Sequence, residues 1–220
     1  MGVSIQNAIL SLMKKFILIA GLIAANPLPG RAAGASAHGP HSTVTLAAET
    51  LSARPGEEVW LGLLFQMEKD WHIYWKNPGD SGQAPEVRWT LPPGFAVGAT
   101  QWPYPRRLEL PPLTNFGYEG QVLLPVRLKV PSGAKAGPIS IEASLDWLIC
   151  KVECLPAAGV VKISLPVSVK TPAPDARYKE AFARAKAALP GDFPEWRLHA
   201  EAEKNAVTLT VKPAQKSASP

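Results

Sequence analysis

The sequence predicts a mainly β protein, an immunoglobulin-like antiparallel β-sandwich followed by a helix and a β-hairpin. The chain contains 23 prolines in 220 residues, and proline is excluded from helix interiors and central strands, which favours short strands joined by loops. From Thr43 on, apolar residues recur at every second position in several segments, with turn residues between the segments. This alternation is typical of antiparallel sheets that have one packed face and one solvated face.

The alternating segments place the strands in order along the chain. The first covers 58–66, where the apolar residues from Val59 to Phe65 share one face. Residues 72–75 and 86–90 flank a segment rich in Gly, Pro and Asp, which predicts a loop. Three longer strands follow at 122–130, 139–147 and 161–169. We expect four aromatic residues near the first strands to pack in the core: Trp71, Tyr74, Trp75 and Trp89.

The first 37 residues have the pattern of a secretory signal peptide. Lys14 and Lys15 precede a ten-residue apolar run, and a small-residue stretch with Ala-x-Ala sites ending at Ala35 or Ala37 follows it. Ten apolar residues are too few to span a bilayer, which needs roughly 20. The sequence therefore predicts export from the cytoplasm to a compartment where disulfides persist. Attachment of a full-length form to the inner membrane is left open.

The charge of the chain does not indicate nucleic-acid binding. The formal net charge is +5, but Lys14, Lys15 and Arg31 lie in the predicted signal peptide, and no acidic residue precedes Glu49. The exported chain would therefore carry 20 basic and 18 acidic residues. No cluster of Lys and Arg is present that would track a phosphate backbone.

The composition changes in residues 171–220. Asp175 is placed to cap a helix whose apolar face carries Tyr178, Phe182, Ala185 and Leu189. Two strands are predicted next, at 196–202 and 207–211. One helix and one hairpin cannot bury a core alone. We expect this segment either to pack on the sandwich or to begin a second β domain that the chain cuts short.

Two cysteines, Cys150 and Cys154, are the only ones in the chain. A disulfide requires Cα atoms about 4.4–6.8 Å apart, whereas four steps of extended strand cover about 13 Å. If the two residues bond, the chain must turn between them, with the strand ending near Ile149. Trp147 and Ile149 share the apolar face of that strand, so we expect Cys150 on the other face, with its sulfur exposed to solvent.

Three functions remain open for the pair from its spacing. Closing so short a loop contributes only about 2 kcal/mol of stability, so a structural staple would be weak. A redox couple needs a pair that partners can reach. Two thiolates plus His or Met can hold Cu(I), but the four histidines show no ligand spacing to the pair. Copper-delivery proteins with a similar Cys-x3-Cys-x-Pro motif carry it in a thioredoxin-like fold, whereas β pattern lies on both sides here.

Four stretches together resemble one family: "DWHIYWKNPGDSGQAPEVRW", "WPYPRR", "NFGYEGQVLLPV" and "LDWLICKVECLP". They are similar to the N-terminal periplasmic domain of the thiol:disulfide interchange protein DsbD, especially its ScsB-like branch. The resemblance implies that the compartment of the exported chain is the periplasm, and it implies an immunoglobulin-like redox domain at 38–170 that needs no cofactor and no metal. It also implies that Cys154 forms mixed disulfides with partners, that Cys150 resolves them, and that Phe116 or Tyr118 caps the pair.

The resemblance further implies a protein-disulfide reductase, and the chain would be one domain of it. A thioredoxin-like donor, fed by a membrane electron-transfer domain in cis or in trans, would reduce the pair. The pair would then reduce disulfide isomerase-like, thioredoxin-like or cytochrome c maturation proteins. The cysteines of the best-known family member are more widely spaced, so its site geometry cannot be transferred.

Four residues near the pair are expected to modulate its reactivity: Asp146, Lys151, Glu153 and His72. A nearby carboxylate disfavours a thiolate, whereas a lysine favours it. His72 could act as a general base, although a histidine in this setting is more often a packed core residue. The competing interpretations are a non-catalytic exported adaptor with a local disulfide, and a Cu(I)-binding module.

Overall fold

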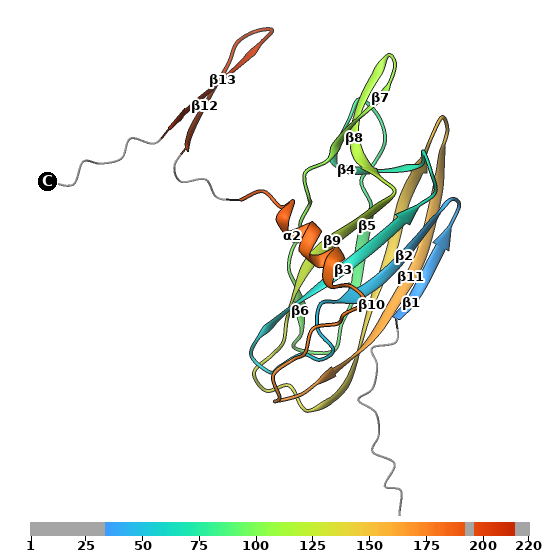
Figure 1. Cartoon of the computed structure of the whole chain (residues 1–220), viewed down its shortest axis with the longest axis vertical. Coiled ribbons are helices and arrows are strands. Elements are labelled where there is room, and N and C mark those ends of the chain that lie inside the picture. Colours follow the sequence, from blue (N-terminus) through green and yellow to red (C-terminus); the bar gives the residue numbers. More distant parts are fainter. Residues whose placement is uncertain (1–33, 192–195, 214–220) are drawn as a thin grey trace, which may run out of the picture. The chain divides into compact units, whose positions relative to one another are not determined.

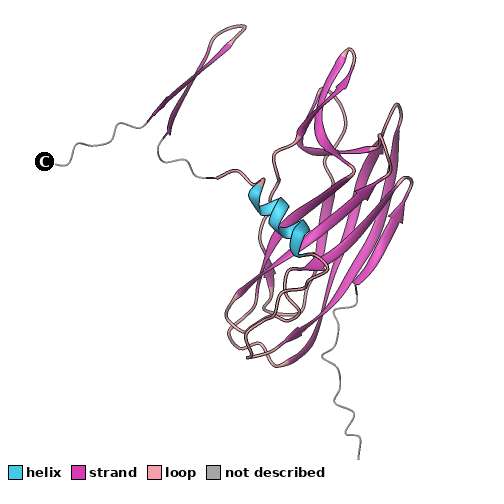
Figure 2. Ribbon diagram, in the orientation of Figure 1, coloured by secondary structure: helices cyan, strands magenta, loops and turns pink. Residues whose placement is uncertain are grey.

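A computed structural model describes residues 34–191 and 196–213 of the chain. Most of the described chain forms one 11-stranded antiparallel sheet that curls over a common core (Figures 1 and 2). This architecture confirms the predicted immunoglobulin-like β-sandwich. The described helix is too short and too polar to cross a membrane.

The sheet divides into two halves that are joined through β1 (Gly34–Gly39). Gly34 and Ala35 pair with β11, and the four residues that follow them pair with β2. The first half runs outward from β1 through β2 (Ser42–Ala48), β3 (Glu58–Met67), β9 (Gln121–Lys129) and β6 (Ala96–Val97). The second half runs through β11 (Cys154–Val167), β10 (Gly137–Cys150), β4 (His72–Gly79), β8 (Leu113–Glu119) and β7 (Arg106–Leu110). Strand β5 (Glu86–Thr90) also pairs with β10.

The core lies between the two halves and consists of the residues that alternation predicted. Leu61, Leu63 and Phe65 of β3 are completely buried. They face Leu145 and Trp147 of β10 across the same hydrophobic cluster. The predicted strand at 161–169 starts seven residues too late and ends two residues too late, because β11 covers Cys154–Val167. Of the four expected core aromatics, Tyr74 is fully buried, and the three tryptophans are partly buried against the core.

Helix α2 (Lys179–Ala187) packs on the outer face of the first half of the sheet. Phe182 and Ala185 of the helix form a second hydrophobic cluster with Ala47, Leu64 and Leu123. Leu64 and Leu123 point to this side because they alternate with the core residues of β3 and β9. Helix α2 therefore packs on the sandwich, and the role of 171–220 as a whole stays a prediction.

The predicted N-cap at Asp175 is wrong. The helix begins at Lys179 with Tyr178 as its N-cap, and Tyr178 makes no side-chain capping bond. Asp175 is buried, and its carboxylate accepts hydrogen bonds from the backbone and side chain of Arg177. Its backbone N–H binds the carbonyl of Glu49, which ties the segment before the helix to the sandwich. The carboxylate is thus occupied in a local turn.

Strands β12 (Trp196–Ala202) and β13 (Val207–Pro213) form a separate two-stranded sheet at the positions predicted for a hairpin. Whether this hairpin begins a second domain stays a prediction. Residues 1–33 of the predicted signal peptide lie outside the described residues. Its last four residues, 34–37, belong to β1, and Ala37 is buried in the core.

Candidate functional site

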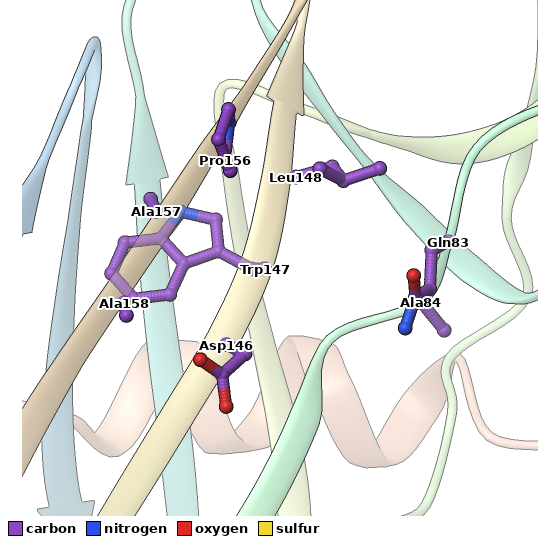
Figure 3. A pocket seen from close by; sticks show the side chains of 8 residues that line it. All are labelled: Gln83, Ala84, Asp146, Trp147, Leu148, Pro156, Ala157 and Ala158. Carbon is purple, nitrogen blue, oxygen red and sulfur yellow. The ribbon is translucent and has the colours of Figure 1, made fainter.

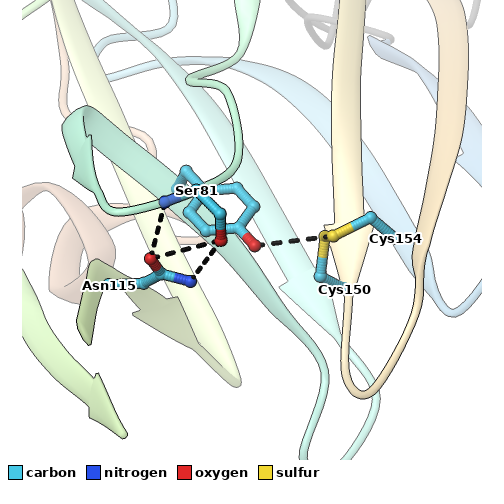
Figure 4. Close-up of a disulfide and its surroundings, with 5 residues drawn as sticks. Ser81, Asn115, Cys150 and Cys154 are labelled. Carbon is cyan, nitrogen blue, oxygen red and sulfur yellow. Dashed lines mark hydrogen bonds between the residues drawn. A yellow bond between two sulfur atoms is a disulfide. The ribbon is translucent and has the colours of Figure 1, made fainter. Parts of the chain in front are cut away.

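The two cysteines form a disulfide across the end of the β10–β11 hairpin (Figure 4). Cys150 and Cys154 are the last register pair of the two strands, and their Cα atoms are 4.1 Å apart. The turn between them is closed by a hydrogen bond from the Lys151 N–H to the Glu153 carbonyl, 3.1 Å long. The predicted turn is confirmed, with β10 continuing one residue beyond Ile149.

Pro156 lies inside β11 opposite Leu148. β11 pairs with β10 along its full length, but with β1 only at Lys162 and Ile163. On the side away from β10, residues 154–161 therefore have no paired strand within 34–191 and 196–213. Proline is tolerated at such an edge because it has no N–H to donate to a neighbouring strand.

The two sulfurs differ in their accessibility. Cys154 is exposed, whereas Cys150 is only 1% exposed. The expectation that Cys150 shows its sulfur to solvent is therefore wrong. Alternation places Cys150 on the face opposite Ile149, as predicted, but β4 adds to β10 at this point and pairs His72 with Cys150. The disulfide thus has one open sulfur and one covered sulfur.

Tyr74 of β4 covers the pair and contacts it directly. Its hydroxyl lies 3.5 Å from the Sγ of Cys154, and because a disulfide sulfur carries no hydrogen, the tyrosine donates this hydrogen bond. Burial raises the pKa of Tyr74, and a hydrogen bond with Ser81 opposes that increase. The phenol is therefore held protonated, as a donor aimed at the exposed sulfur.

The loop after β4 fixes the position of the Tyr74 ring. Gly82 has a φ of +89°, and a Cβ added there would lie 2.2 Å from the ring. The backbone can pass this close to the ring only because residue 82 has no side chain. Buried Asn115 of β8 anchors the loop: it accepts from the N–H of Ser81 at 3.0 Å and donates to the Ser81 hydroxyl at 2.9 Å (Figure 4).

His72 lies next to the covered sulfur. It is 3% exposed, and its Nε2 has no hydrogen-bond partner in the described part of the chain. Its ring meets the Tyr74 ring edge to face, with centroids 5.2 Å apart. Burial lowers the pKa of His72, and the charge of Glu119 partly opposes this. The structure thus places this predicted modulator beside Cys150.

The charged residues expected to modulate the thiols are engaged elsewhere or solvated. Asp146 pairs with Arg88 of β5 at 2.5 Å, and Lys151 pairs with Asp70 at 3.1 Å. Glu153 is exposed in the turn. Within 34–191 and 196–213, no group of three or more His, Cys, Asp or Glu side chains is placed to hold a metal ion.

The two candidate cap residues lie on β8. Tyr118 is buried in the core, where it pairs with Ile73 and donates a hydrogen bond of 2.6 Å to the carbonyl of Pro103. The hydroxyl of Tyr118 is thus bound inside the fold, and a cap role for Tyr118 stays a prediction. Phe116 is half-buried and pairs with Arg107. A cap role for Phe116 stays a prediction.

A shallow pocket of about 330 Å³ lies on the β10–β11 hairpin (Figure 3). Leu148 and Pro156 line it, and they are the register pair two positions before Cys150 and after Cys154. The loop residues Gln83 and Ala84 and the strand residue Asp146 also line it. A partly apolar hollow therefore lies two register positions from the disulfide.

Sequence reasoning missed three residues of this site: Tyr74, Ser81 and Asn115. Tyr74 was expected only as core packing, and it is indeed fully buried. Its second role depends on the hydroxyl reaching a sulfur 80 positions away in the chain. No local pattern signals such a contact, because β4 and β10 become neighbours only in the sheet.

Comparisons with known proteins agree with this geometry. Residues 43–166, more than half of the chain, match the family model described as "Thiol:disulfide interchange protein DsbD, N-terminal". The N-terminal periplasmic domain of ScsB from Proteus mirabilis has a similar fold, with a TM-score of 0.60 and 22% identity over 84% of this chain and 70% of that one.

The GAE domain of yeast GGA1 is more distant, with a TM-score of 0.31 and 11% identity over 61% of this chain and 99% of that one. No curated protein matches the chain significantly in sequence.

Proposed function

Since the chain belongs to the family of DsbD N-terminal domains, a family of thiol–disulfide interchange domains, we propose that it carries electrons between proteins in the periplasm through Cys150 and Cys154. In this proposal a thioredoxin-like donor reduces the pair. The donor receives its electrons from a membrane electron-transfer domain in cis or in trans. The reduced pair then serves exported disulfide-handling or cytochrome c maturation proteins. An N-terminal signal peptide would direct the chain to that compartment.

The observation that carries the proposal is the unequal exposure of the two sulfurs. Thiol–disulfide exchange proceeds by attack of a thiolate on one disulfide sulfur, so its rate depends on access to that sulfur. Cys154 is exposed, whereas Cys150 is buried where β4 pairs with β10. This asymmetry supports a role for Cys154 in the mixed disulfide with a partner and for Cys150 in its resolution.

The reaction proceeds in two balanced steps. The Cys154 thiolate attacks the acceptor disulfide, forms a mixed disulfide and releases one acceptor sulfur as a thiolate. Cys150 then loses its proton and attacks the Cys154 Sγ, which forms the intramolecular disulfide and releases the second acceptor sulfur. Two electrons and two protons pass to the acceptor, and the donor restores the dithiol by the same steps in reverse.

The surroundings of Cys154 suit a transient partner. The hydroxyl of Tyr74 donates to its sulfur, and hydrogen bonding to a thiolate favours the charged form. The pocket lined by Leu148 and Pro156 offers a small apolar surface two register positions from the disulfide. A partner that leaves after each exchange needs only a small interface. Phe116 would act as a lid that moves on docking.

Trapping of mixed disulfides tests the proposal. A Cys150→Ser variant lacks the resolving thiol, so we expect it to accumulate a disulfide between Cys154 and a periplasmic thioredoxin-like protein, visible by non-reducing gel and mass spectrometry. The matched Cys154→Ser variant should form none, because its remaining sulfur is buried.

The reduction potential separates this function from the two alternatives. A reduction potential below about −300 mV is typical of structural disulfides that resist reduction. Such a potential, together with no trapped mixed disulfide, would contradict the proposal. Stoichiometric Cu(I) uptake by the reduced chain, lost when either cysteine is changed, would favour the copper-binding alternative instead.

A further inference from the structure

His72 is the one histidine that the fold places against the reacting pair. It lies directly opposite Cys150 in the antiparallel register of β4 and β10, and side chains at such positions share a face, with Cβ atoms about 4.5–5.5 Å apart. Cys154 in turn lies directly opposite Cys150. The three side chains therefore form a row across three neighbouring strands.

The Nε2 atom of His72 has no hydrogen-bond partner within 34–191 and 196–213 although the side chain is 97% buried. Leaving a buried polar atom unpaired costs about 1–3 kcal/mol, so such an atom in a folded protein calls for an explanation. A thiol at Cys150, present only after the disulfide is reduced, would supply the missing donor. In the oxidised state the sulfur carries no hydrogen and cannot supply it.

The other groups around His72 leave this role open. Tyr74, two positions along β4, directs its hydroxyl to Cys154. Glu119 of β8 lies opposite His72 on the far side from Cys150, and Arg106 of β7 lies 4.0 Å from its carboxylate. Glu119 opposes the lowering of the His72 pKa that burial causes.

Asp70, two residues before His72, is already paired with Lys151, the residue after Cys150. Asp80, in the loop over Tyr74, accepts from the N–H of Thr114.

We propose that His72 is the general base of the resolving step, taking the proton of the Cys150 thiol as Cys150 attacks the mixed disulfide at Cys154. This proposal rests on the proposed exchange function and adds the group that activates its buried thiol. A buried thiol in apolar surroundings has a raised pKa and is inert without such a partner.

The step balances as follows. The proton moves from the Cys150 sulfur to Nε2 of a neutral His72 imidazole. The Cys150–Cys154 bond forms, the bond from Cys154 to the acceptor sulfur breaks, and the acceptor leaves as a thiolate. The imidazolium then returns its proton to that thiolate or to water. In the reverse direction, the imidazolium protonates Cys150 as a donor thiolate displaces it.

Reaction of the reduced chain with dithiobis-nitrobenzoate separates the two cysteines, because each sulfur releases one coloured thionitrobenzoate. The first release reports attack by Cys154, and the second reports resolution by Cys150. We expect His72→Gln and His72→Leu to slow the second release about tenfold at pH 7 and to move its pH profile to higher pH, as for a buried thiol without a base. The first release should change less than the second.

His199→Gln is the matched control, because His199 lies exposed on the β12–β13 hairpin, and it should leave both releases unchanged. A second release with the wild-type rate and pH profile in folded His72→Gln overturns the proposal for His72. If neither cysteine of the wild-type chain reacts, the exchange function itself fails.

Nuclear magnetic resonance of the wild-type imidazole provides a test that needs no variant. We expect the pKa of His72 to differ between the oxidised and reduced chains, because only the reduced chain presents a titrating sulfur to Nε2. An identical pKa in both states would contradict a proton shared with Cys150, whatever the stability of the variants.

Discussion

Replacing Tyr74 by Phe removes the hydroxyl that hydrogen-bonds to the exchanging sulfur and to Ser81, and keeps the ring. The ring stays in its buried position, while the donor at 3.5 Å from Cys154 is lost. A hydrogen bond to a charged group contributes about 1.5–3 kcal/mol, and the exposure of Cys154 favours the lower end. At 1.36 kcal/mol per pKa unit, the thiol pKa of Cys154 should rise by about one unit.

The consequence for reactivity changes sign with pH. At pH 7 an increase of one unit leaves about one tenth of the thiolate, but each thiolate becomes about threefold more nucleophilic, so the net rate falls about threefold. At a pH above both pKa values each sulfur is fully ionised, and Tyr74→Phe should react faster than its parent. This crossing distinguishes a pKa effect from loss of access, which would slow the reaction at every pH.

Alkylation by iodoacetamide, followed by mass spectrometry across this pH range, measures the effect. The Cys150→Ser background isolates Cys154, and Tyr104→Phe is the matched control because the Tyr104 side chain is 67% exposed. Superimposable rate–pH profiles for Tyr74→Phe and its parent would refute the reasoning that Tyr74 stabilises the thiolate.

Two further predictions concern stability. Phe182→Ala removes the aromatic ring from the cluster under helix α2 and should lower the free energy of unfolding by about 3–5 kcal/mol in urea denaturation. Val169→Ala is the control, because Val169 is 73% exposed. An equally small loss for both variants would show that the helix does not pack there. Burial lowers the folded-state pKa of His72 below its unfolded value of 6.5, so its contribution is present above that pH and is lost as the pH falls through the folded pKa. Below pH 6.5 the wild-type chain should therefore lose urea stability more steeply than His72→Gln, and equal pH dependence would contradict the burial of a neutral imidazole.

The sequence by itself determined the class of fold and the position of the reactive pair. Alternation placed the core faces of β3, β9, β10 and β11, because strand geometry puts every second side chain on the same face. The spacing of Cys150 and Cys154 required a turn between them if they form a disulfide. These inferences depend only on the local geometry of the chain, so they hold before any strand finds its neighbour.

Tertiary structure decided which sulfur is open. From β10 alone, the outward face of Cys150 suggested exposure, but β4 pairs with β10 there and brings His72 and Tyr74 to the disulfide. Strand order in a sheet depends on contacts between residues far apart in sequence, and no period along one strand reveals its neighbour. The same long-range pairing buried Tyr118 in the core and left Cys154 at a free edge, and so the chemistry of the pair depends on the assembled sheet.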